Sequence, residues 1–325
     1  MDFKYKKMEI ETEIVKLKKL LEKEVNKDIN DGCDGILLSA GLDTSILSYL
    51  AAKKTKNFKA FTLKFGNHAP DAEYAEKLCQ ILNIEHHLLE ADEEILMKNL
   101  REAIKISGVF DPMEIRNSVA IYTILKFSKD YVRGVMTGDG ADELFFGYDF
   151  LIKMKKDERK FYAKNMWKTM HFSSNDMGRF FGIKIWTPYL SGEVKNYAIS
   201  LDDDVKINGS VGKWILRKAY ENLLPKEFIM REKTPIEYGS GTTLLTNIFE
   251  NKISDEVFIK KKSEYKESDG AIIRDKEHLY YYEIYREIFG KVKEAKQDEI
   301  KCAGCGIGIE HKKAFCRICG TMNGF

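Results

Sequence analysis

The chain has 325 residues, 44% of them hydrophobic, and a formal net charge of only +2. Its apolar runs are too short and too often interrupted to span a membrane, and the first residues lead into charged side chains rather than the apolar core of a secretory signal. A near-neutral charge neither requires nor excludes a nucleic-acid partner. These features predict a cytoplasmic protein with one large core and a small appended part.

Helices and strands are predicted to alternate along the first half of the chain. Apolar residues at helical spacing predict a helix over residues 8–28, and a short apolar run predicts the first strand at 35–38. The next predicted elements are a helix to about residue 54, a strand at 58–65, a helix beginning at 72, a strand at 85–89 and a strand ending at 137. Strands joined through helices form parallel sheets. From about residue 150 the pattern is mainly helical, so we predict an α/β fold with a doubly wound parallel sheet and a helical C-terminal half that closes the substrate pocket.

A turn of small residues, from Ser39 to Ser45, joins the first strand to the next helix. Backbone N–H groups at a helix N-terminus are unpaired, and the helix dipole adds positive charge there. Small hydroxyl side chains complete the contacts to an anion without crowding it. The turn is therefore predicted to bind a polyphosphate.

The same turn lacks the Walker A spacing, in which a lysine reaches the outer phosphates, and carries Asp43 instead. An acid beside phosphates requires a cation between them, which makes Asp43 a candidate Mg²⁺ ligand. The alternative is an ordinary polar cap on a helix.

A second turn, rich in acids, follows the strand that ends near Thr137. It reads Gly-Asp-Gly-Ala-Asp-Glu over residues 138–143. Three acids within five residues repel one another unless they share a cation or a proton. Because the carboxyl ends of parallel strands meet at one edge of a sheet, we predict a second metal-binding arm across the same crevice, with a solvated acidic loop as the alternative.

Together the two turns resemble the synthetase domain of the asparagine synthetase family, which belongs to the PP-loop pyrophosphatase group of ATP users. There the first loop usually reads Ser-Gly-Gly-x-Asp-Ser-Ser and the second Gly-Asp/Glu-Gly-x-Asp-Glu-x-Phe-Gly-Gly-Tyr. The similarity continues, in the family's order, through residues 111–118, 213–219, 224–227, 231–233 and 239–241. It covers residues from about 30 to about 245 and implies an adenine nucleotide α hydrolase-like fold.

The resemblance also implies ATP and Mg²⁺ as cofactors. A substrate oxygen, normally a carboxylate, would attack the α-phosphorus and give an adenylate and pyrophosphate. The implied nucleotide-binding residues are Ser39, Gly41, Asp43, Thr44 and Ser45 for the phosphates, and Leu63, Phe65, Thr137 and Gly138 for the adenine.

Individual site residues carry further implied roles. Asp43 and Asp142 are similar to the family's magnesium ligands. Arg116 and Lys233 match positions associated with phosphate and intermediate stabilisation, a solvated side chain being the alternative for each. Asp139 matches an acid that orients or deprotonates the amine, provided that neighbouring carboxylates raise its pKa. Glu143 is expected to support the loop.

Some positions depart from the family pattern. Ala40 and Phe146 replace usual glycines in the two loops. Within residues 182–191, Lys184, Trp186 and Ser191 stand where the family has Glu, Arg and Asp. Because these changes reverse one charge and remove two others, they predict that aspartate is not the substrate.

The nitrogen donor is a further departure. The family's glutaminase domain uses a cysteine exposed after removal of the initiator Met, whereas position 2 here is Asp2, and about thirty residues precede the first strand. We therefore expect no glutaminase domain on this chain. The second substrate would be ammonia, an amine or a sulfur donor, or ammonia supplied by a separate glutaminase.

Two Cys-x-x-Cys-Gly knuckles lie near the end of the chain and contain Cys302, Cys305, Cys316 and Cys319. This spacing presents four thiolates to a tetrahedral metal, and Zn²⁺ is the first choice. An iron–sulfur cluster or redox-active thiols are the alternatives. The turn-capable span Glu310-His311-Lys312-Lys313 between the knuckles predicts a compact zinc ribbon.

The sequence thus predicts an N-terminal helix at 1–30, a synthetase domain at 31–295 and a zinc ribbon at 300–325. We predict an AMP-forming ligase that joins a carboxylate to ammonia or an amine, as a homo-oligomer with no membrane partner. The alternative is a tRNA base-modifying enzyme in which the ribbon grips RNA. Lys312, Lys313 and Arg317 with Phe315 would give that ribbon only a thin basic and stacking surface.

Overall fold

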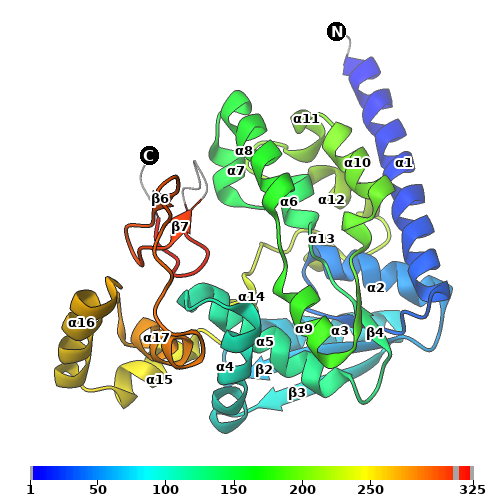
Figure 1. Ribbon diagram of the computed structural model, residues 1–325. Helices are drawn as coiled ribbons and strands as arrows, with labels where there is room; N and C mark the ends of the chain where they lie inside the picture. Colours follow the sequence, from blue (N-terminus) through cyan, green and yellow to red (C-terminus); the bar gives the residue numbers. More distant parts are fainter. Residues whose placement is uncertain (1–2, 310–314, 323–325) are drawn as a thin grey trace. The chain divides into compact units, whose positions relative to one another are not determined.

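The computed structural model describes residues 3–309 and 315–322, with side chains from residue 10 onward. The chain divides into two compact units, whose elements can be followed in Figure 1. Unit 1 comprises Met1–Thr62, Pro70–Leu89 and Lys126–Pro235, and unit 2 comprises Leu63–Ala69, Glu90–Leu125 and Ile236–Phe325. The turn expected at Glu310, His311, Lys312 and Lys313 lies outside the described residues.

The central element is a five-stranded sheet of order β3-β2-β1-β4-β5. Its strands are β1 (Gly35–Leu37), β2 (Lys59–Phe65), β3 (Glu85–Ala91), β4 (Gly134–Met136) and β5 (Lys184–Trp186). β1 runs parallel to both β2 and β4, and β4 runs parallel to β5. Ile36, Val135 and Met136 are fully buried, as in sheets covered on both faces. The predicted parallel, doubly wound sheet is confirmed.

Helices make up most of the rest of unit 1. They are α1 (Phe3–Asn30), α2 (Leu42–Lys54), α3 (Pro70–Leu82), α6 (Ala141–Phe145), α7 (Asp149–Lys153), α8 (Lys156–Thr169), α9 (Ser173–Phe181), α10 (Gly192–Ser200), α11 (Asp203–Lys206), α12 (Trp214–Tyr220) and α13 (Lys226–Ile229), with a 3₁₀ turn, η1 (Pro188–Leu190). α1 buries Leu17, Leu21 and Val25 along one face and packs against α2, α10 and α12. The apolar stripe of the N-terminal helix thus joins the main core.

Unit 2 is mainly helical. Its elements are α4 (Glu93–Ser107), most of α5 (Pro112–Ser128), α14 (Ile236–Gly239), α15 (Leu244–Lys252), α16 (Asp255–Asp269), α17 (Lys276–Phe289) and the antiparallel strands β6 (Ile300–Lys301) and β7 (Gly308–Ile309). α17 packs against α4 and α15. The predicted helical C-terminal half is confirmed.

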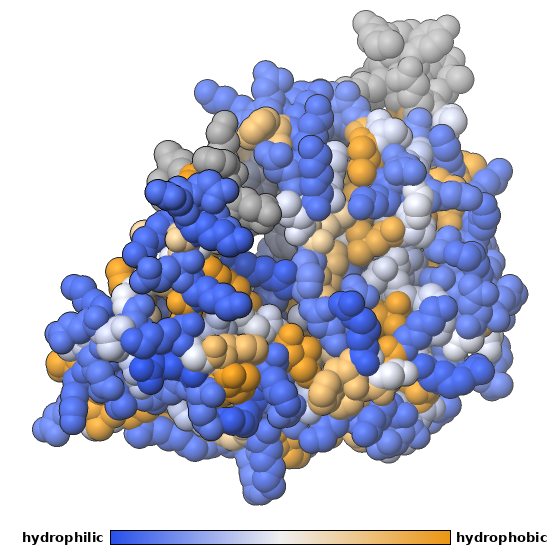
Figure 2. Space-filling view, in the orientation of Figure 1, coloured by the Kyte–Doolittle hydropathy of each residue, from blue (hydrophilic) through white to orange (hydrophobic). Residues whose placement is uncertain are grey.

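On the face drawn in Figure 2, hydrophilic residues predominate, and apolar residues are scattered among them. Within the described part of the chain, no helix is both long enough and apolar enough to cross a membrane.

Candidate active site

The two motifs follow two neighbouring strands of unit 1. β1 ends at Leu37 and leads into the turn of Ser39, whereas β4 ends at Met136 and leads into the acidic turn. The chain winds outward from β1 through β2 on one side and through β4 on the other. In sheets of this kind ligands bind beyond the strand ends at such a switch point. The order of the strands therefore brings the two motifs to one place.

The turn after β1, which we call the phosphate loop (residues 39–45), contains buried polar atoms without hydrogen-bond partners among the described residues. Ser39 Oγ accepts a hydrogen bond from the Gly41 N–H at 3.3 Å and lies 3.2 Å from Thr44 Oγ1. No side chain caps the start of α2, unlike an ordinary capped helix. Asp43 Oδ1 and Ser45 Oγ are buried and have no hydrogen-bond partner among the described residues. A buried polar atom without a hydrogen-bond partner lowers the stability of a protein unless a ligand pairs with it. The Asp43 carboxylate oxygen therefore suits a cation, and the Ser45 hydroxyl suits a phosphate oxygen.

Both residues that replace expected glycines adopt the left-handed backbone conformation. Ala40 has φ +53° and Phe146 has φ +58°. Only glycine adopts this conformation without a steric cost, which is about 1–2 kcal/mol per residue for other types. The two loops therefore keep the backbone geometry that glycine would favour, at the cost of local strain.

A cluster of two acids and two lysines lies where the loops meet. Lys213 Nζ is 2.5 Å from Asp43 Oδ2 and 2.7 Å from Asp142 Oδ1. Lys233 Nζ donates to the other carboxylate oxygen of Asp142 at 2.8 Å. The side chains of Asp43, Asp142 and Lys213 are all at most 15% exposed. The cluster is therefore a set of alternating charges in which Asp43, Asp142 and Lys213 are largely shielded from water and Lys233 is partly exposed.

The lysines set the protonation of the cluster. Burial alone would raise the pKa of Asp142, but Lys213 and Lys233 outweigh it and hold that pKa well below its ordinary value. Burial raises the pKa of Asp43, and Lys213 opposes the rise. Burial would lower the pKa of Lys233, but Asp142 raises it above its ordinary value, so Lys233 stays cationic. Oxygen ligands for a hard cation and positive groups for phosphates are thus both present.

The backbone holds Lys213 in place. Its φ is +53°, and its N–H donates to the Phe145 carbonyl at 3.0 Å, just before α12 begins. A Cβ atom at Gly147 would lie 1.9 Å from Asp142 Oδ1 and 2.3 Å from Cε of Lys213. Glycine at position 147 is therefore required for the lysine and the aspartate to meet.

The other two acids of the second turn, Asp139 and Glu143, accept hydrogen bonds from hydroxyl groups. Asp139 accepts hydrogen bonds from the hydroxyls of Thr137 at 2.7 Å and Ser174 at 2.5 Å. Glu143 accepts one from the Tyr148 hydroxyl at 2.7 Å. The pKa of Asp139 is raised chiefly by burial, and Asp142 contributes only a smaller share. The pKa of Asp139 is therefore raised mainly by desolvation rather than by the neighbouring carboxylates that we expected to raise it, and its role as a proton acceptor stays a prediction.

Arg231 is a site residue that sequence reasoning did not single out. Its guanidinium donates to the Ser39 carbonyl of the phosphate loop and, at 2.6 Å, to Asp71. It also lies 4.0 Å from the ring centre of Tyr74. Lys213 was missed in the same way. Both belong to stretches that carry the resemblance, but Lys213 lies 170 residues from Asp43 and Arg231 lies 160 residues from Asp71, so no spacing pattern could indicate their role.

Two of the predicted adenine residues lie next to the cluster. The N–H of Thr137 donates to the Trp186 carbonyl at 3.0 Å. A Cβ atom at Gly138 would lie 3.1 Å from Cβ of Asp43, a tight contact that shows how closely the two loops approach each other. Both residues remain predicted adenine contacts.

The other predicted nucleotide residues belong to unit 2. The Phe65 N–H donates to the Ser240 carbonyl at 2.8 Å, and Leu63 is buried. Arg116 pairs with the buried carboxylate of Glu277 at 2.8 Å. Arg116 therefore already has a buried counter-ion within the protein. The roles of these three residues remain predictions.

The positions used to argue against aspartate have local structural roles. Trp186 pairs with Met136 in the sheet, and Lys184 Nζ lies 4.4 Å from the centre of its ring. Ser191 caps α10 by accepting a hydrogen bond from the Val194 N–H at 3.4 Å. These residues therefore have local structural contacts in addition to any effect on the substrate, and the exclusion of aspartate stays a prediction.

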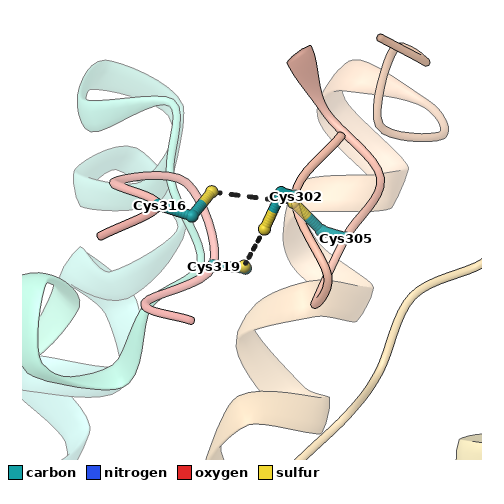
Figure 3. A group of neighbouring side chains, drawn as sticks. All are labelled: Cys302, Cys305, Cys316 and Cys319. Atoms are coloured by element: carbon teal, nitrogen blue, oxygen red, sulfur yellow. Dashed lines mark hydrogen bonds between the residues drawn. The ribbon is translucent and has the colours of Figure 1, made fainter. Parts of the chain in front are cut away.

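In unit 2, the four knuckle cysteines converge as drawn in Figure 3. The Sγ atoms of Cys302 and Cys319 are 3.7 Å apart, and those of Cys305 and Cys316 are 3.8 Å apart. A tetrahedron with Zn–S bonds of about 2.3 Å has edges of about 3.8 Å. All four side chains are buried, so the thiols fit one tetrahedral metal.

The family model for asparagine synthase matches residues 16–170 and 157–302. The chain belongs to the asparagine synthase family. The resemblance drawn from the two motifs is thus confirmed for most of the sequence. The match ends at residue 302 and therefore leaves out Cys305, Cys316 and Cys319.

Individual relatives agree with this family. A glutamine-hydrolyzing asparagine synthetase from Sandersonia aurantiaca is 25% identical over 327 residues, covering 92% of this chain and 60% of the relative. A probable glutamine-hydrolyzing asparagine synthetase from Schizosaccharomyces pombe is 27% identical over 293 residues, covering 78% and 52%. The chain thus spans only about half to three-fifths of the length of these relatives.

Solved structures offer more distant likenesses. An NH3-dependent NAD synthetase from Campylobacter jejuni has a TM-score of 0.38 and 17% identity, covering 78% of this chain and 94% of the other. An NMN synthetase from Francisella tularensis has a TM-score of 0.33 and 16% identity, covering 70% and 92%. These likenesses are too distant to carry an argument about function.

Proposed function

We propose that this protein is an ATP-dependent ligase that forms AMP and pyrophosphate, adenylates a carboxylate and transfers the acyl group to ammonia or an amine. The observation that carries the proposal is the charged cluster beside the phosphate loop, in which Asp43, Asp142 and Lys213 are buried and Lys233 is partly exposed. Family membership supplies the class of reaction. We place the protein in the cytoplasm; the homo-oligomer stays a prediction.

Asp43 and Asp142 would hold Mg²⁺, since Asp43 Oδ1 is buried without a partner among the described residues and carboxylate oxygens suit this cation. When bound, the ion would neutralise charge on the departing pyrophosphate. The phosphate loop would bind the nucleotide through Ser39, Gly41, Thr44 and Ser45. Lys233, which is cationic and 38% exposed, is free to turn from Asp142 toward a phosphate.

The residues at the acidic turn also suit the second half of the reaction. A substrate carboxylate oxygen would bond to the α-phosphorus as the bond to pyrophosphate breaks. The amine would then attack the acyl carbon, AMP would leave, and Asp139 would accept the amine proton. Because burial raises the pKa of Asp139, its carboxylate is a stronger base than an exposed aspartate. The hydroxyls of Thr137 and Ser174 would hold it in position.

The ribbon favours this ligase over the tRNA-modifying alternative. We propose that Cys302, Cys305, Cys316 and Cys319 bind one structural Zn²⁺. The backbone of both knuckles bonds to the rest of unit 2: the Ile318 carbonyl accepts from the Phe110 N–H at 2.8 Å, and the Gly304 carbonyl accepts from the Ile272 N–H at 2.7 Å. A ribbon attached in this way has a structural role in unit 2, and we propose this role in place of RNA binding.

The function is tested by AMP release from ATP and Mg²⁺. Carboxylate metabolites are supplied with ammonium, with glutamine or with neither, and a parallel series contains unmodified tRNA with ammonium or sulfide. We expect AMP with a carboxylate and ammonium. Asp43→Ala and Asp142→Ala should abolish it, whereas Glu193→Ala, at an exposed acid of α10, should not. AMP that appears only with tRNA, or ADP as the product, would contradict the proposal.

The metal is tested separately by elemental analysis. We expect about one zinc per chain, lost in a Cys302→Ser/Cys305→Ser double variant and retained in Cys79→Ala, which changes a buried cysteine of α3. A coloured, iron-containing preparation would instead indicate an iron–sulfur cluster.

A further inference from the structure

A cavity of about 600 Å³ lies in unit 1 behind the acidic turn. Its walls come from α8, α10 and α11, which can be located in Figure 1, and from the side chain of Phe146. Cavities of this size hold metabolites. Phe146 stands where the family usually has glycine, which has no side chain, so the aromatic part of this wall distinguishes the present chain from the usual family pattern. The proposed ligase reaction makes no use of the cavity.

One cation is buried in the cavity wall. Lys206 is only 1% exposed, and its Nζ lies 4.7 Å from the ring centre of Phe146 and 5.2 Å from that of Trp167. The two rings are nearly parallel, with an interplanar angle of 7°. Aromatic faces stabilise a buried ammonium, but they replace its lost hydration only in part. Burial accordingly lowers the pKa of Lys206 to about 8.

Further lysines line the cavity. Lys160, Lys164 and Lys168 follow one another at four-residue intervals along α8 and therefore share one face of that helix, and Lys195 comes from α10. No ion pair within 4.0 Å involves any of these four lysines in the part of the chain that the structure describes. Like charges placed together in this way repel one another unless an anion lies among them.

The two acids of the cavity wall are already paired with cations. Asp203 accepts a hydrogen bond from Arg159 at 2.9 Å, and Asp202 accepts one from Lys156 at 2.9 Å. Neither Arg159 nor Lys156 belongs to the cavity lining. The two acids also act on the lining lysines Lys160 and Lys206, but five lysines against two acids leave the cavity lining with a net positive charge.

We propose that this cavity binds a small molecule that carries a phosphate group, at a site separate from the phosphate loop. Lys160, Lys164, Lys168 and Lys195 are accessible and supply charge-assisted hydrogen bonds to phosphate oxygens, and the half-buried Trp167 ring supplies an apolar wall for the rest of the molecule. The Trp167 indole N–H donates to the Glu143 carbonyl at 2.9 Å, so the ligand lies directly behind the acidic turn. A phosphorylated metabolite there is in a position to regulate the ligase.

The experiment is a fluorescence titration with inorganic phosphate at constant ionic strength. A non-hydrolysable ATP analogue and Mg²⁺ saturate the phosphate loop throughout. Trp167 is one of three tryptophans and lies in the cavity wall, so it reports binding directly. We expect a saturable change that Trp167→Phe removes. Lys164→Gln/Lys168→Gln, at two exposed positions, should weaken binding at least about tenfold, whereas Lys260→Gln/Lys266→Gln on α16 should leave it unchanged.

Citrate and an eight-nucleotide RNA are titrated in the same way. A response equal in the Lys164→Gln/Lys168→Gln variant and the unchanged protein would overturn the proposal. So would a site that responds to citrate and not to phosphate, because its ligand would then be a carboxylate. RNA that binds through these lysines far more tightly than phosphate would assign the cavity to a nucleic-acid backbone instead.

Discussion

Lys213 and Asp43 are 170 residues apart in the sequence, yet the lysine ammonium lies 2.5 Å from Oδ2 of the aspartate. The same ammonium lies 2.7 Å from Asp142, so a single side chain from the start of α12 joins the two loop motifs. A metal ion that approaches both acids must share them with this lysine. Lys213 thus balances the charge of the site whenever the cation is absent.

Replacement of Lys213 should therefore disable the site without unfolding the protein. In Lys213→Gln, two buried carboxylates lose their shared counter-charge, and we expect AMP formation to fall by about 100-fold or more. The matched control is Lys218→Gln, at a partly exposed lysine of the same helix that pairs with Glu221 at 2.6 Å. Circular dichroism should be native in both variants. Turnover of Lys213→Gln within threefold of the unchanged protein would remove this lysine from the mechanism.

The strain at Ala40 predicts opposite outcomes for two small substitutions. Ala40→Gly relieves about 1–2 kcal/mol of steric strain and gives back about 0.5–1 kcal/mol through the greater freedom of the unfolded chain. The free energy of unfolding in urea should therefore be unchanged or slightly higher. Ala40→Val, which places a branched side chain at φ +53° in a fully buried position, should lower it by more than about 2 kcal/mol. Equal losses in the two variants would show that the loop is not strained.

Two glycines in unit 2 provide a matched test of how the ribbon is attached. Gly320 and Gly270 have φ of +75° and +68°, so alanine at either position should cost about 1 kcal/mol of unfolding free energy from the backbone alone. A Cβ atom at Gly320 would also lie 1.7 Å from Asp111 Oδ1, whereas one at Gly270 would meet nothing within 4 Å. We expect Gly320→Ala to be the more destabilising and to release zinc faster to a chelator. Identical melting temperatures and release rates would contradict the attachment.

Asp28, near the end of α1, predicts a dependence of stability on pH. Burial raises its pKa to about 7, from 3.8 in the unfolded chain. The folded state therefore holds a proton that the unfolded state loses, and the stability contributed by this group falls as the pH rises from about 4 to about 7. Asp28→Asn should raise the melting temperature by a few degrees at pH 8 and have little effect at pH 4. A shift of the same size at both pH values would assign the effect to packing instead.

The sheet and its two turns could be predicted because their signals are local. Short apolar runs followed at once by glycine, hydroxyl or acidic residues mark β1 and β4, and parallel pairing then places Asp43 near Asp142. Lys213 and Arg231 could not be found in this way, because folding brings them to the site from distant segments. A single charged residue on a helix or loop has no periodicity to distinguish it from a solvated one.

Substitutions near the site make contacts that the motif comparison could not reveal. Trp186 pairs within the edge strand β5 and Ser191 caps α10, and the prediction that aspartate is not the substrate stays a prediction. Motif comparison shows which residue changed and not which contact it makes. The roles of Phe65 and Arg116 depend on unit 2, and the sequence contains no sign that the chain passes repeatedly between two units.

Because the chain crosses repeatedly between the two units, neither unit can be completed during synthesis from one continuous segment. The chain moves from one unit to the other after residues 62, 69, 89, 125 and 235, so no single cut yields two segments that each contain a complete unit. β2 and β3 would each be severed by a separation of the units. At ribosomal rates β1 emerges roughly 5 to 20 s before β4, its neighbour at the phosphate loop. During that interval β1 can pair with β2 on one side only, so the edge of β1 that β4 later covers remains unpaired until four of the five strands have been synthesised.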